Sequence, residues 1–314
     1  VFSKLVPKQA QTSKILYSIY CVLTLVEVLC LKLAGMPLYD AFIHAFSSAG
    51  TGGFSNRNAS VGAYGSVAID LIITVFILLF SLNFAVYFLL LTRRWREALS
   101  SDELRFFLLV VAGATILIAI NIAPLYTSIW ESLRYSVFQV ASIISTTGFS
   151  SVDFNLWPEF SRTLLVILMI CGACAGSTGG GVKCARILLL FKSLRQEIRQ
   201  TIHPRSVHVV KLDGQVVEER ALHKTHVFFA AYLLTFACGI LLVSIDNFSF
   251  TTTVTAVVTC LGNCGPGLGL VGPMGNFSIF SVLSKLALSL CMIIGRLEFF
   301  PILVLFSQNA WKRS

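Results

Sequence analysis

The stretch Ser145-Thr146-Thr147-Gly148-Phe149-Ser150-Ser151 is a polar, glycine-bearing strip between two apolar runs. The pattern recurs upstream as Thr51-Gly52-Gly53-Phe54-Ser55 and, more loosely, downstream as Asn263-Cys264-Gly265-Pro266-Gly267. Each strip follows a short apolar segment and precedes a long one. Gly and Ser are common in surface turns, so one such strip would mean little. Three strips at the same place in a repeated unit favour a shared function.

The composition of the strips is suited to binding a cation. Backbone carbonyls held in a loop can replace the water shell of an ion, and the Ser and Thr hydroxyls add oxygens. Glycine allows backbone angles that other residues resist. The strips contain no Lys, Arg, Asp or Glu. We therefore interpret them as pore loops whose selectivity filter consists of backbone carbonyls, which favours a monovalent ion such as potassium.

The composition of the whole chain excludes an ordinary soluble domain. Of the 314 residues, 56% are hydrophobic and 12% are charged, whereas about a quarter are charged in soluble proteins. Several apolar runs reach the roughly 20 residues needed to cross a bilayer. The net charge is +9, but the basic residues cluster in a few loops, as in cytoplasmic loops of membrane proteins. These features predict an all-α polytopic membrane protein that binds lipid and no nucleic acid.

The apolar runs divide the chain into three tandem units with the same order: span, short pore helix, filter strip, span. Residues 1–92 hold a span at 15–35, a pore helix at 39–49, a filter at 51–55 and a span at 66–91. Residues 93–200 hold a span at 106–122, a pore helix at 130–144, a filter at 145–150 and a broken span at 160–199 with a loop at 172–182. A cytoplasmic linker at 201–224 precedes residues 225–314, with a span at 225–245, a pore helix at 249–261, a filter at 262–267 and a span at 278–306.

The short segments are too short to cross a membrane and suit re-entrant half-helices. Parallel units with re-entrant loops imply a ring around a central axis. If each half-helix directs its C-terminal end inward, its partial negative charge favours a cation at the centre. Basic residues at 93–105, and few in the expected outer loops, place the span ends on opposite sides of the membrane.

The sequence resembles the Trk/Ktr/HKT superfamily of potassium transporters, and its Trk-type branch in particular. The resemblance covers essentially the whole chain. It rests on the three strips and on four further motifs: Asp153-Phe154, Trp157-Pro158, Gly176-Ser177-Thr178-Gly179-Gly180-Gly181-Val182-Lys183 and Gly295-Arg296-Leu297-Glu298.

The resemblance implies potassium uptake across a bacterial plasma membrane, with no enzymatic activity and no cofactor on this chain. It implies potassium-binding filter residues at Thr51, Gly52, Gly53, Thr146, Thr147, Gly148, Asn263, Cys264 and Gly265. The family has four repeats, so a first repeat with its own strip is expected to be missing here. A homodimer and a cytosolic, nucleotide-binding regulatory subunit of the TrkA type are also implied.

The glycine-rich segment from Gly176 to Lys183 superficially matches a phosphate-binding loop. That motif requires Gly-Lys-Ser/Thr after a strand, whereas Val182 separates Gly181 from Lys183 and the flanks are apolar helix. Non-helical backbone at membrane depth survives only against protein or water. We therefore expect a broken helix that lies below the filter and gates the pore, formed by Gly176, Ser177, Thr178, Gly179, Gly180, Gly181 and Lys183 with Arg296.

Arg296 lies inside the last apolar run, where a charge is costly. It could snorkel to the interface, but we expect it to face the pore, repel cations and bind carbonyls of the glycine-rich loop. His44 is expected to pack in its half-helix, and Asp70 and Asn83 to bond to neighbouring helices, with a pore-lining role as the alternative. Cys171 and Cys174 have the spacing of two zinc ligands, but no second pair of cysteines and no nearby histidine accompany them in the sequence, so a metal site is not expected there.

Three functions remain open on these observations. The first is a potassium-conducting pore subunit with a channel-like mechanism. The second is a sodium- or proton-coupled secondary transporter, which parallel repeats disfavour because such folds usually contain inverted repeats. The third is a non-conducting membrane scaffold. For a pore subunit, the basic segment 185–199 and the linker to Lys224 form the largest expected surface for a regulatory partner.

Overall fold

The computed structural model of the chain describes residues 9–203 and 209–297 and is built almost entirely of helices. The first unit contains α1 (Gln9–Leu33), α2 (Leu38–Ala49), α3 (Val67–Ser81) and α4 (Phe84–Leu91). The second contains α5 (Trp95–Ser100), α6 (Asp102–Ile122), α7 (Ile129–Ile144), α8 (Glu159–Cys171) and α9 (Cys184–Ile202). The third contains α10 (Glu219–Val243), α11 (Phe250–Gly262) and α12 (Val282–Leu297).

A small hairpin lies in the linker between the second and third units. Strands β1 (Lys211–Leu212) and β2 (Gln215–Val216) pair antiparallel. Short 3₁₀ turns occur in the loops at Ser60–Tyr64, Ala123–Leu125, Phe154–Leu156, Ser244–Asp246, Gly269–Val271 and Phe277–Ile279. The linker is shorter than the predicted 201–224, because α9 continues to Ile202 and α10 already begins at Glu219.

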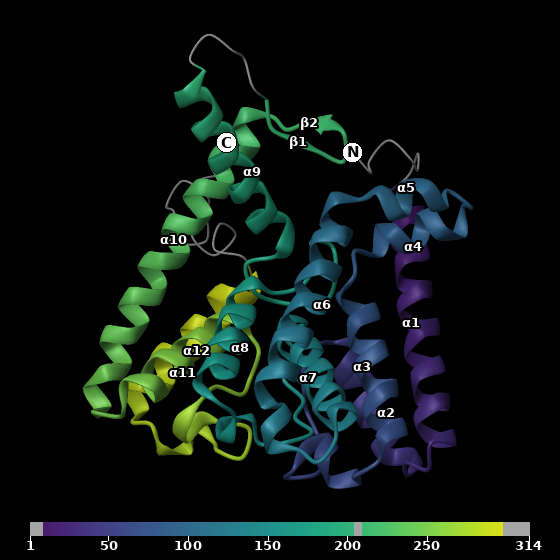
Figure 1. Cartoon of the computed structure of the whole chain (residues 1–314), viewed down its shortest axis with the longest axis vertical. Coiled ribbons are helices and arrows are strands. Elements are labelled where there is room, and N and C mark those ends of the chain that lie inside the picture. The colour runs from purple at the N-terminus through teal and green to yellow at the C-terminus, as the bar shows by residue number, and fades with distance from the viewer. Residues whose placement is uncertain (1–8, 204–208, 298–314) are drawn as a thin grey trace, which may run out of the picture.

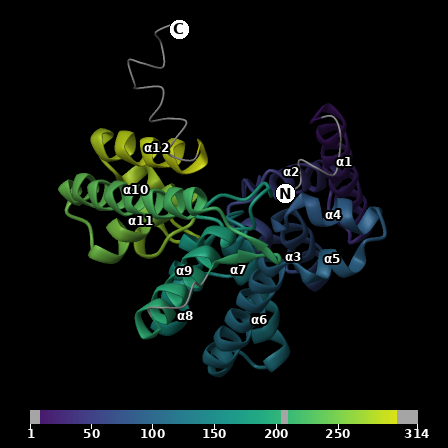
Figure 2. The same ribbon diagram turned by 90° about the horizontal axis from the view of Figure 1, so that it is seen from above.

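The units are arranged side by side around a common centre. Figure 2 shows α1–α5 on one side, α10–α12 on the other, and α6–α9 between them. In Figure 1, α4, α5, α9 and the hairpin gather at one end of the molecule. A buried apolar cluster, including Phe107, Ile118, Ile144 and Leu165, joins the helices of the second unit. The helices that flank the second strip therefore pack tightly against one another.

Three helices of the described residues are long and apolar enough to cross a membrane: Lys14–Leu33, Asp102–Leu125 and Glu219–Asp246. The span predicted at 66–91 is divided into two helices, α3 and α4, which are bent by 91° at a short break. Leu82 is extended, and the Asn83 side chain caps α4 by accepting from Ala85 N at 2.9 Å. The uniform apolarity of this run conceals the break.

The predicted pore helices 39–49, 130–144 and 249–261 correspond to α2, α7 and α11 within one residue at each end. The broken span is helical at Glu159–Cys171 and resumes at Cys184 rather than Ala185. In the last predicted span, residues 298–306 lie outside the described residues, as does Glu298 of the Gly295-Arg296-Leu297-Glu298 motif.

Candidate ion pore

Each pore helix ends in the same pair of backbone hydrogen bonds. In the first bond of each pair, an amide donates to the carbonyl three residues before it in the last turn of the helix: Thr51 to Ser48 (3.1 Å), Thr146 to Ile143 (3.0 Å) and Asn263 to Cys260 (3.2 Å). In the second bond, the amide of the following residue donates to the carbonyl five residues before it: Gly52 to Ser47 (2.7 Å), Thr147 to Ser142 (3.0 Å) and Cys264 to Thr259 (2.9 Å). The three strips therefore leave their helices by one repeated geometry.

The first residue of this exit is left-handed in all three units. The φ angles are 50° at Thr51, 61° at Thr146 and 56° at Asn263. The left-handed residue ends the helix as an αL cap does, and it is uncommon for threonine. Two residues later a glycine of each strip also has positive φ: Gly53 (66°), Gly148 (85°) and Gly265 (103°).

The strips of neighbouring units lie against each other through these glycines. A β-carbon built on Gly53 would come within 2.0 Å of the Thr147 carbonyl oxygen, and one on Gly148 within 1.9 Å of the Cys264 carbonyl oxygen. Real β-carbons do not approach so closely. Only glycine therefore allows the carbonyl of the next strip to lie at this position, so sequential units are also sequential neighbours around the centre.

The outer side of the strips forms one shared cavity of about 400 Å³. It is lined by residues of all three strips: Gly52, Gly53, Phe54, Ser55, Thr147, Gly148, Ser150, Cys264, Gly265 and Pro266. Segments more than 200 residues apart in the chain thus converge on one polar mouth. Apart from Arg57, the side chains lining this mouth carry no charge.

The ring of strips has two free edges within the described residues. No heavy atom lies within 4 Å of a β-carbon built on Gly265, unlike those on Gly53 and Gly148. At the other edge, Phe54 is 76% exposed. Its counterpart Phe149 is fully buried and stacked on His44 of the preceding unit, with ring centroids 5.5 Å apart. The third and first strips therefore each lack the neighbour that the second strip has on both sides.

His44 packs as the sequence predicted. Its Nδ1 lies 2.8 Å from the Asp40 carbonyl oxygen and its Nε2 lies 3.0 Å from Ser55 Oγ, so it also supports the first strip.

A polar cluster fixes the loop after the first strip. Asp40 accepts hydrogen bonds from Tyr64 Oη (2.6 Å), Asn56 Nδ2 (2.6 Å) and Arg57 Nη2 (3.0 Å). The bond from Tyr64, followed by those from Asn56 and Arg57, lowers the pKa of Asp40 to about 2. The carboxylate therefore stays charged in the physiological range and neutralises Arg57 at the mouth.

The glycine-rich loop lies directly beneath the strips. Thr51 Oγ1 donates to the Thr178 carbonyl at 3.0 Å, and Thr146 Oγ1 accepts from Gly180 N at 2.6 Å. A β-carbon on Gly180 would come within 2.7 Å of the Gly262 carbonyl oxygen. The loop thus contacts the inner ends of all three pore helices, and glycine is required for that approach.

Arg296 reaches the same loop. Its Nη1 donates to the Thr178 carbonyl at 3.1 Å, and the ammonium of Lys183 donates to the Gly179 carbonyl. Together they border a polar cavity of about 280 Å³, lined by Ser177, Thr178, Gly179, Gly180, Gly181, Lys183, Gly295 and Arg296. All of the loop and arginine residues predicted from the sequence except Gly176 border this cavity. Gly176 lies instead against the Asn83 side chain.

The sequence analysis missed Glu103. This carboxylate is buried in α6, and its Oε1 accepts from Ala175 N at 2.6 Å, which fixes the entrance of the loop. An acidic residue in the first turn of an apolar span was the available signal. Asp70 of α3 links two helices as expected, because its Oδ2 lies 3.7 Å from Nε of Arg134 in α7. Asn83 instead caps α4 at the break.

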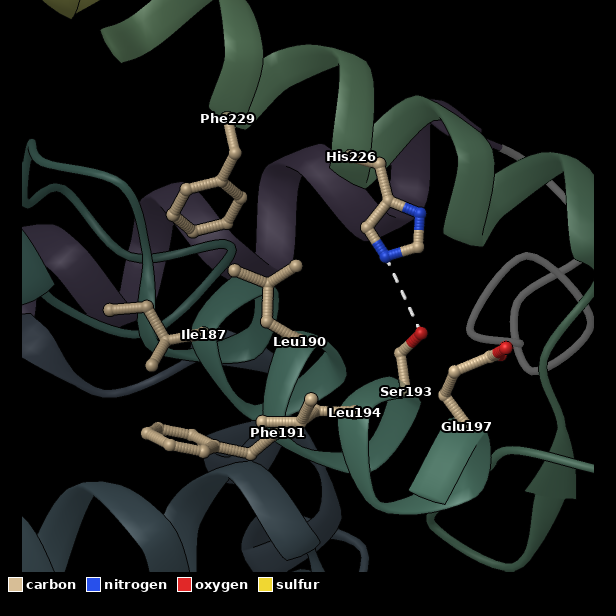
Figure 3. A pocket seen from close by; sticks show the side chains of 8 residues that line it. All are labelled: Ile187, Leu190, Phe191, Ser193, Leu194, Glu197, His226 and Phe229. Atoms are coloured by element: carbon tan, nitrogen blue, oxygen red, sulfur yellow. Dashed lines mark hydrogen bonds between the residues drawn. The ribbon is translucent and has the colours of Figure 1, made fainter. Parts of the chain in front are cut away.

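A third cavity, larger than these two, lies away from the strips. It is an apolar groove of about 680 Å³ between α9 and α10 (Figure 3), lined by Ile187, Leu190, Phe191, Ser193, Leu194, Glu197, His226 and Phe229. Its one marked polar contact joins Ser193 Oγ and His226 Nε2 at 3.4 Å. Among the described residues, no three His, Cys, Asp or Glu side chains are grouped as a metal site.

Comparison with known proteins agrees with this geometry. The family model described as "TrkH: Cation transport protein" matches residues 3–313. The chain belongs to the TrkH family. It is 39% identical over 99% of its length to the Trk system potassium uptake protein TrkH of Salmonella typhimurium, and 33% identical over 98% to TrkG of Escherichia coli. The crystal structure of the potassium transporter TrkH from Vibrio parahaemolyticus matches 98% of the chain at 34% identity, with a TM-score of 0.88.

The predicted helical, multi-pass membrane fold and the predicted family are confirmed by these matches. The chain spans about two thirds of the length of these relatives: 64% of TrkH from Salmonella typhimurium and 67% of the Vibrio parahaemolyticus chain. The relatives are named for potassium uptake or transport.

Proposed function

We propose that this protein conducts potassium ions across the bacterial plasma membrane through a pore at the three strips. The observation that carries the proposal is the convergence of Gly53, Gly148 and Gly265 on one outer mouth, each after the same left-handed helix exit. The exits place the negative ends of three pore helices around one centre, where a cation is favoured. Carbonyls in a ring without charged side chains suit a monovalent ion.

The filter is proposed to comprise Thr51, Gly52, Gly53, Thr146, Thr147, Gly148, Asn263, Cys264 and Gly265. A further strip, between Gly265 and Phe54, is proposed to close the ring. Two observations support it: the open space at Gly265 and the exposure of Phe54, whose counterpart Phe149 is buried. This strip would belong to the missing first of the four repeats that the family resemblance implies.

The glycine-rich loop is proposed as the gate. It lies under the strips and is fixed there by Thr51, Thr146 and Arg296. Its carbonyls lack helical partners, so the donors from Arg296 and Lys183 stabilise it across the path. The guanidinium of Arg296 also opposes entry of a cation from below. Opening of the pore then requires the loop to break its hydrogen bonds with Thr51, Thr146 and Arg296.

A homodimer and a nucleotide-binding regulatory subunit are proposed as partners. On α9, the exposed residues Phe191, Leu194 and Ile198 form an apolar stripe beside the groove, which suits a second copy of the chain. The exposed Arg195 and Arg199 flank this stripe and suit an acidic surface of the regulator.

Rubidium uptake into cells without their own potassium systems tests the function, with expression of the complete gene. We expect saturable uptake that potassium inhibits more strongly than sodium. Uptake no greater than that of the empty vector, with the protein present in the membrane, would exclude conduction. Uptake that is abolished by dissipating the sodium or proton gradient alone would instead indicate coupled transport.

A further inference from the structure

The break between α3 and α4 is hydrogen-bonded to the glycine-rich loop. Cys174 N donates to the Ser81 carbonyl at 3.1 Å, and Phe84 N donates to the Gly176 carbonyl at 3.2 Å. Thr178 Oγ1 adds a bond of 3.3 Å to the Phe80 carbonyl. The bend of 91° removes the helical partners of these groups, and the loop replaces them. The direction of α4 and the position of the loop are therefore coupled.

Beyond the break, α4, α5 and the turn between them (residues 84–100) form a unit that we call the elbow. In Figure 1 the elbow lies across the axis of α1, at the end of the molecule that also carries α9 and the hairpin. This is the cytoplasmic end by the distribution of basic residues. Because α4 is turned by 91° from α3, α4 runs in the plane of the membrane surface if α3 crosses the membrane.

The exposed side chains of the elbow are those of an interfacial segment. Leu91, Trp95 and Leu99 are all about 60–70% exposed. Arg93, Arg94 and Arg96 are exposed beside them, and only Arg94 is paired with an acid of the elbow, Glu97, at 2.6 Å. Tryptophan prefers the headgroup level of a bilayer. Basic residues near the cytoplasmic leaflet attract anionic lipids by about 1 kcal/mol each.

We infer that the elbow binds anionic phospholipid headgroups of the cytoplasmic leaflet through Arg93 and Arg96, and that this binding holds the glycine-rich loop under the strips. The lipid fixes α4 in the surface plane. The bond that the Ser81 carbonyl accepts from Cys174 N and the bond that Phe84 N donates to the Gly176 carbonyl then keep the loop in register with Thr51 and Thr146. Loss of the lipid contact loosens the loop and raises the basal flux. The effect on flux rests on the proposed pore function, whereas the lipid contact does not.

The test uses the complete, purified protein in liposomes without a regulatory subunit. Quenching of Trp95 by brominated phosphatidylglycerol and by brominated phosphatidylcholine is measured as the difference between the unchanged protein and Trp95→Phe. We expect stronger quenching by the anionic lipid. In the double variant Arg93→Gln/Arg96→Gln the preference of the elbow for the anionic lipid over phosphatidylcholine should fall roughly 30-fold, since two arginines are lost. The control Lys14→Gln/Arg220→Gln removes two exposed charges elsewhere at the same end of the molecule and should keep the preference for the anionic lipid.

Rubidium flux into the same liposomes gives the second measurement. The unchanged protein should conduct less when phosphatidylglycerol is present, and Arg93→Gln/Arg96→Gln should conduct equally with and without it. Equal quenching by both lipids, or an unquenched Trp95 because protein covers the elbow, would overturn the lipid site whatever the flux. A lipid preference with flux that ignores lipid composition would overturn the coupling to the loop. Absence of any flux would instead count against the pore function. Millimolar inorganic phosphate should not compete with the anionic lipid for the elbow, so the quenching of Trp95 should not change when it is added.

Discussion

The Cα atom of Gly148 lies so near the Cys264 carbonyl oxygen that a β-carbon on Gly148 would come within 1.9 Å of that oxygen. The same relationship joins Gly53 to Thr147 across the neighbouring interface. A strip carbonyl of one unit thus lies directly against the glycine of the unit before it. The selectivity of the proposed pore depends on this contact as much as on the conformational freedom of glycine.

Gly148→Ala should therefore impair selectivity, because the new methyl group displaces the Cys264 carbonyl and strains a residue with φ of 85°. We expect the preference for potassium over sodium to fall by roughly tenfold, equivalent to about 1.4 kcal/mol. Reversal potentials in mixed salts, measured with the complete protein, check this. Gly113→Ala in α6 is the matched control, because its β-carbon would meet no atom within 4 Å. An unchanged reversal potential in Gly148→Ala would contradict the filter assignment.

Gly265→Ala separates two descriptions of the ring. In the described residues its methyl group meets no neighbour, so only the backbone strain of φ 103° remains. If a further strip closes the ring, a carbonyl of that strip should lie here, and Gly265→Ala should impair selectivity as severely as Gly148→Ala. Reversal potentials of both variants of the complete protein decide the matter. A clearly milder effect at Gly265 would argue against the fourth strip.

Arg296→Ala should raise the basal flux, because the Thr178 carbonyl loses a charged donor and the path loses a positive charge. This bond is exposed, so its loss costs about 0.5–1.5 kcal/mol, and a rise of roughly two- to tenfold is expected in liposomes without a regulator. Deletion within Gly179 to Gly181 should have a similar effect, and the two changes together should add less than their sum. Lys285→Ala, on the same helix but near its start, serves as the control. Unchanged or lower flux in Arg296→Ala, with the fold intact, would refute the gate.

Glu103→Ala should destabilise the loop entrance, because the partly buried Ala175 N–H loses its acceptor at 2.6 Å. The expected cost is about 1–3 kcal/mol, seen as a lower unfolding temperature in detergent and a higher basal flux. Glu103→Gln retains an acceptor oxygen and should restore most of the stability. If the Gln and Ala variants behave alike, the hydrogen bond to Ala175 is not the contribution that matters.

Charge reversal at Arg195 and Arg199 should weaken co-purification with the regulatory subunit, because both are exposed on α9. Lys32→Glu/Lys285→Glu reverses two exposed charges at the opposite end of the molecule and should leave the complex intact. The measurement is the regulator retained on the tagged complete protein at fixed salt. Retention of the complex in the Arg195 and Arg199 variant would place the docking surface elsewhere.

The sequence by itself determined the parts of this protein that depend on composition and local pattern. Apolar runs of sufficient length predicted the spans, and three segments too short to cross predicted α2, α7 and α11. The repeated Gly-bearing strips predicted the site, because few residues other than glycine tolerate such close backbone approach and positive φ. The glycines after Cys171 predicted the interruption of a helix, which the structure places at residues 172–183.

Only the tertiary structure decided which residues meet. The break after Ser81 is invisible in a run of uniform hydropathy, because its hydrogen-bond partners at Cys174 and Gly176 come from another unit. The left-handed turns at Thr51 and Thr146 are stabilised by the pore-helix carbonyls behind them. In the sequence Glu103 is an acidic residue at the start of an apolar span, and its role is evident only from the packing of α6 beside the loop, where it accepts a hydrogen bond from Ala175 N. Contacts between residues distant in the chain depend on packing, and a local pattern holds no information about the partner.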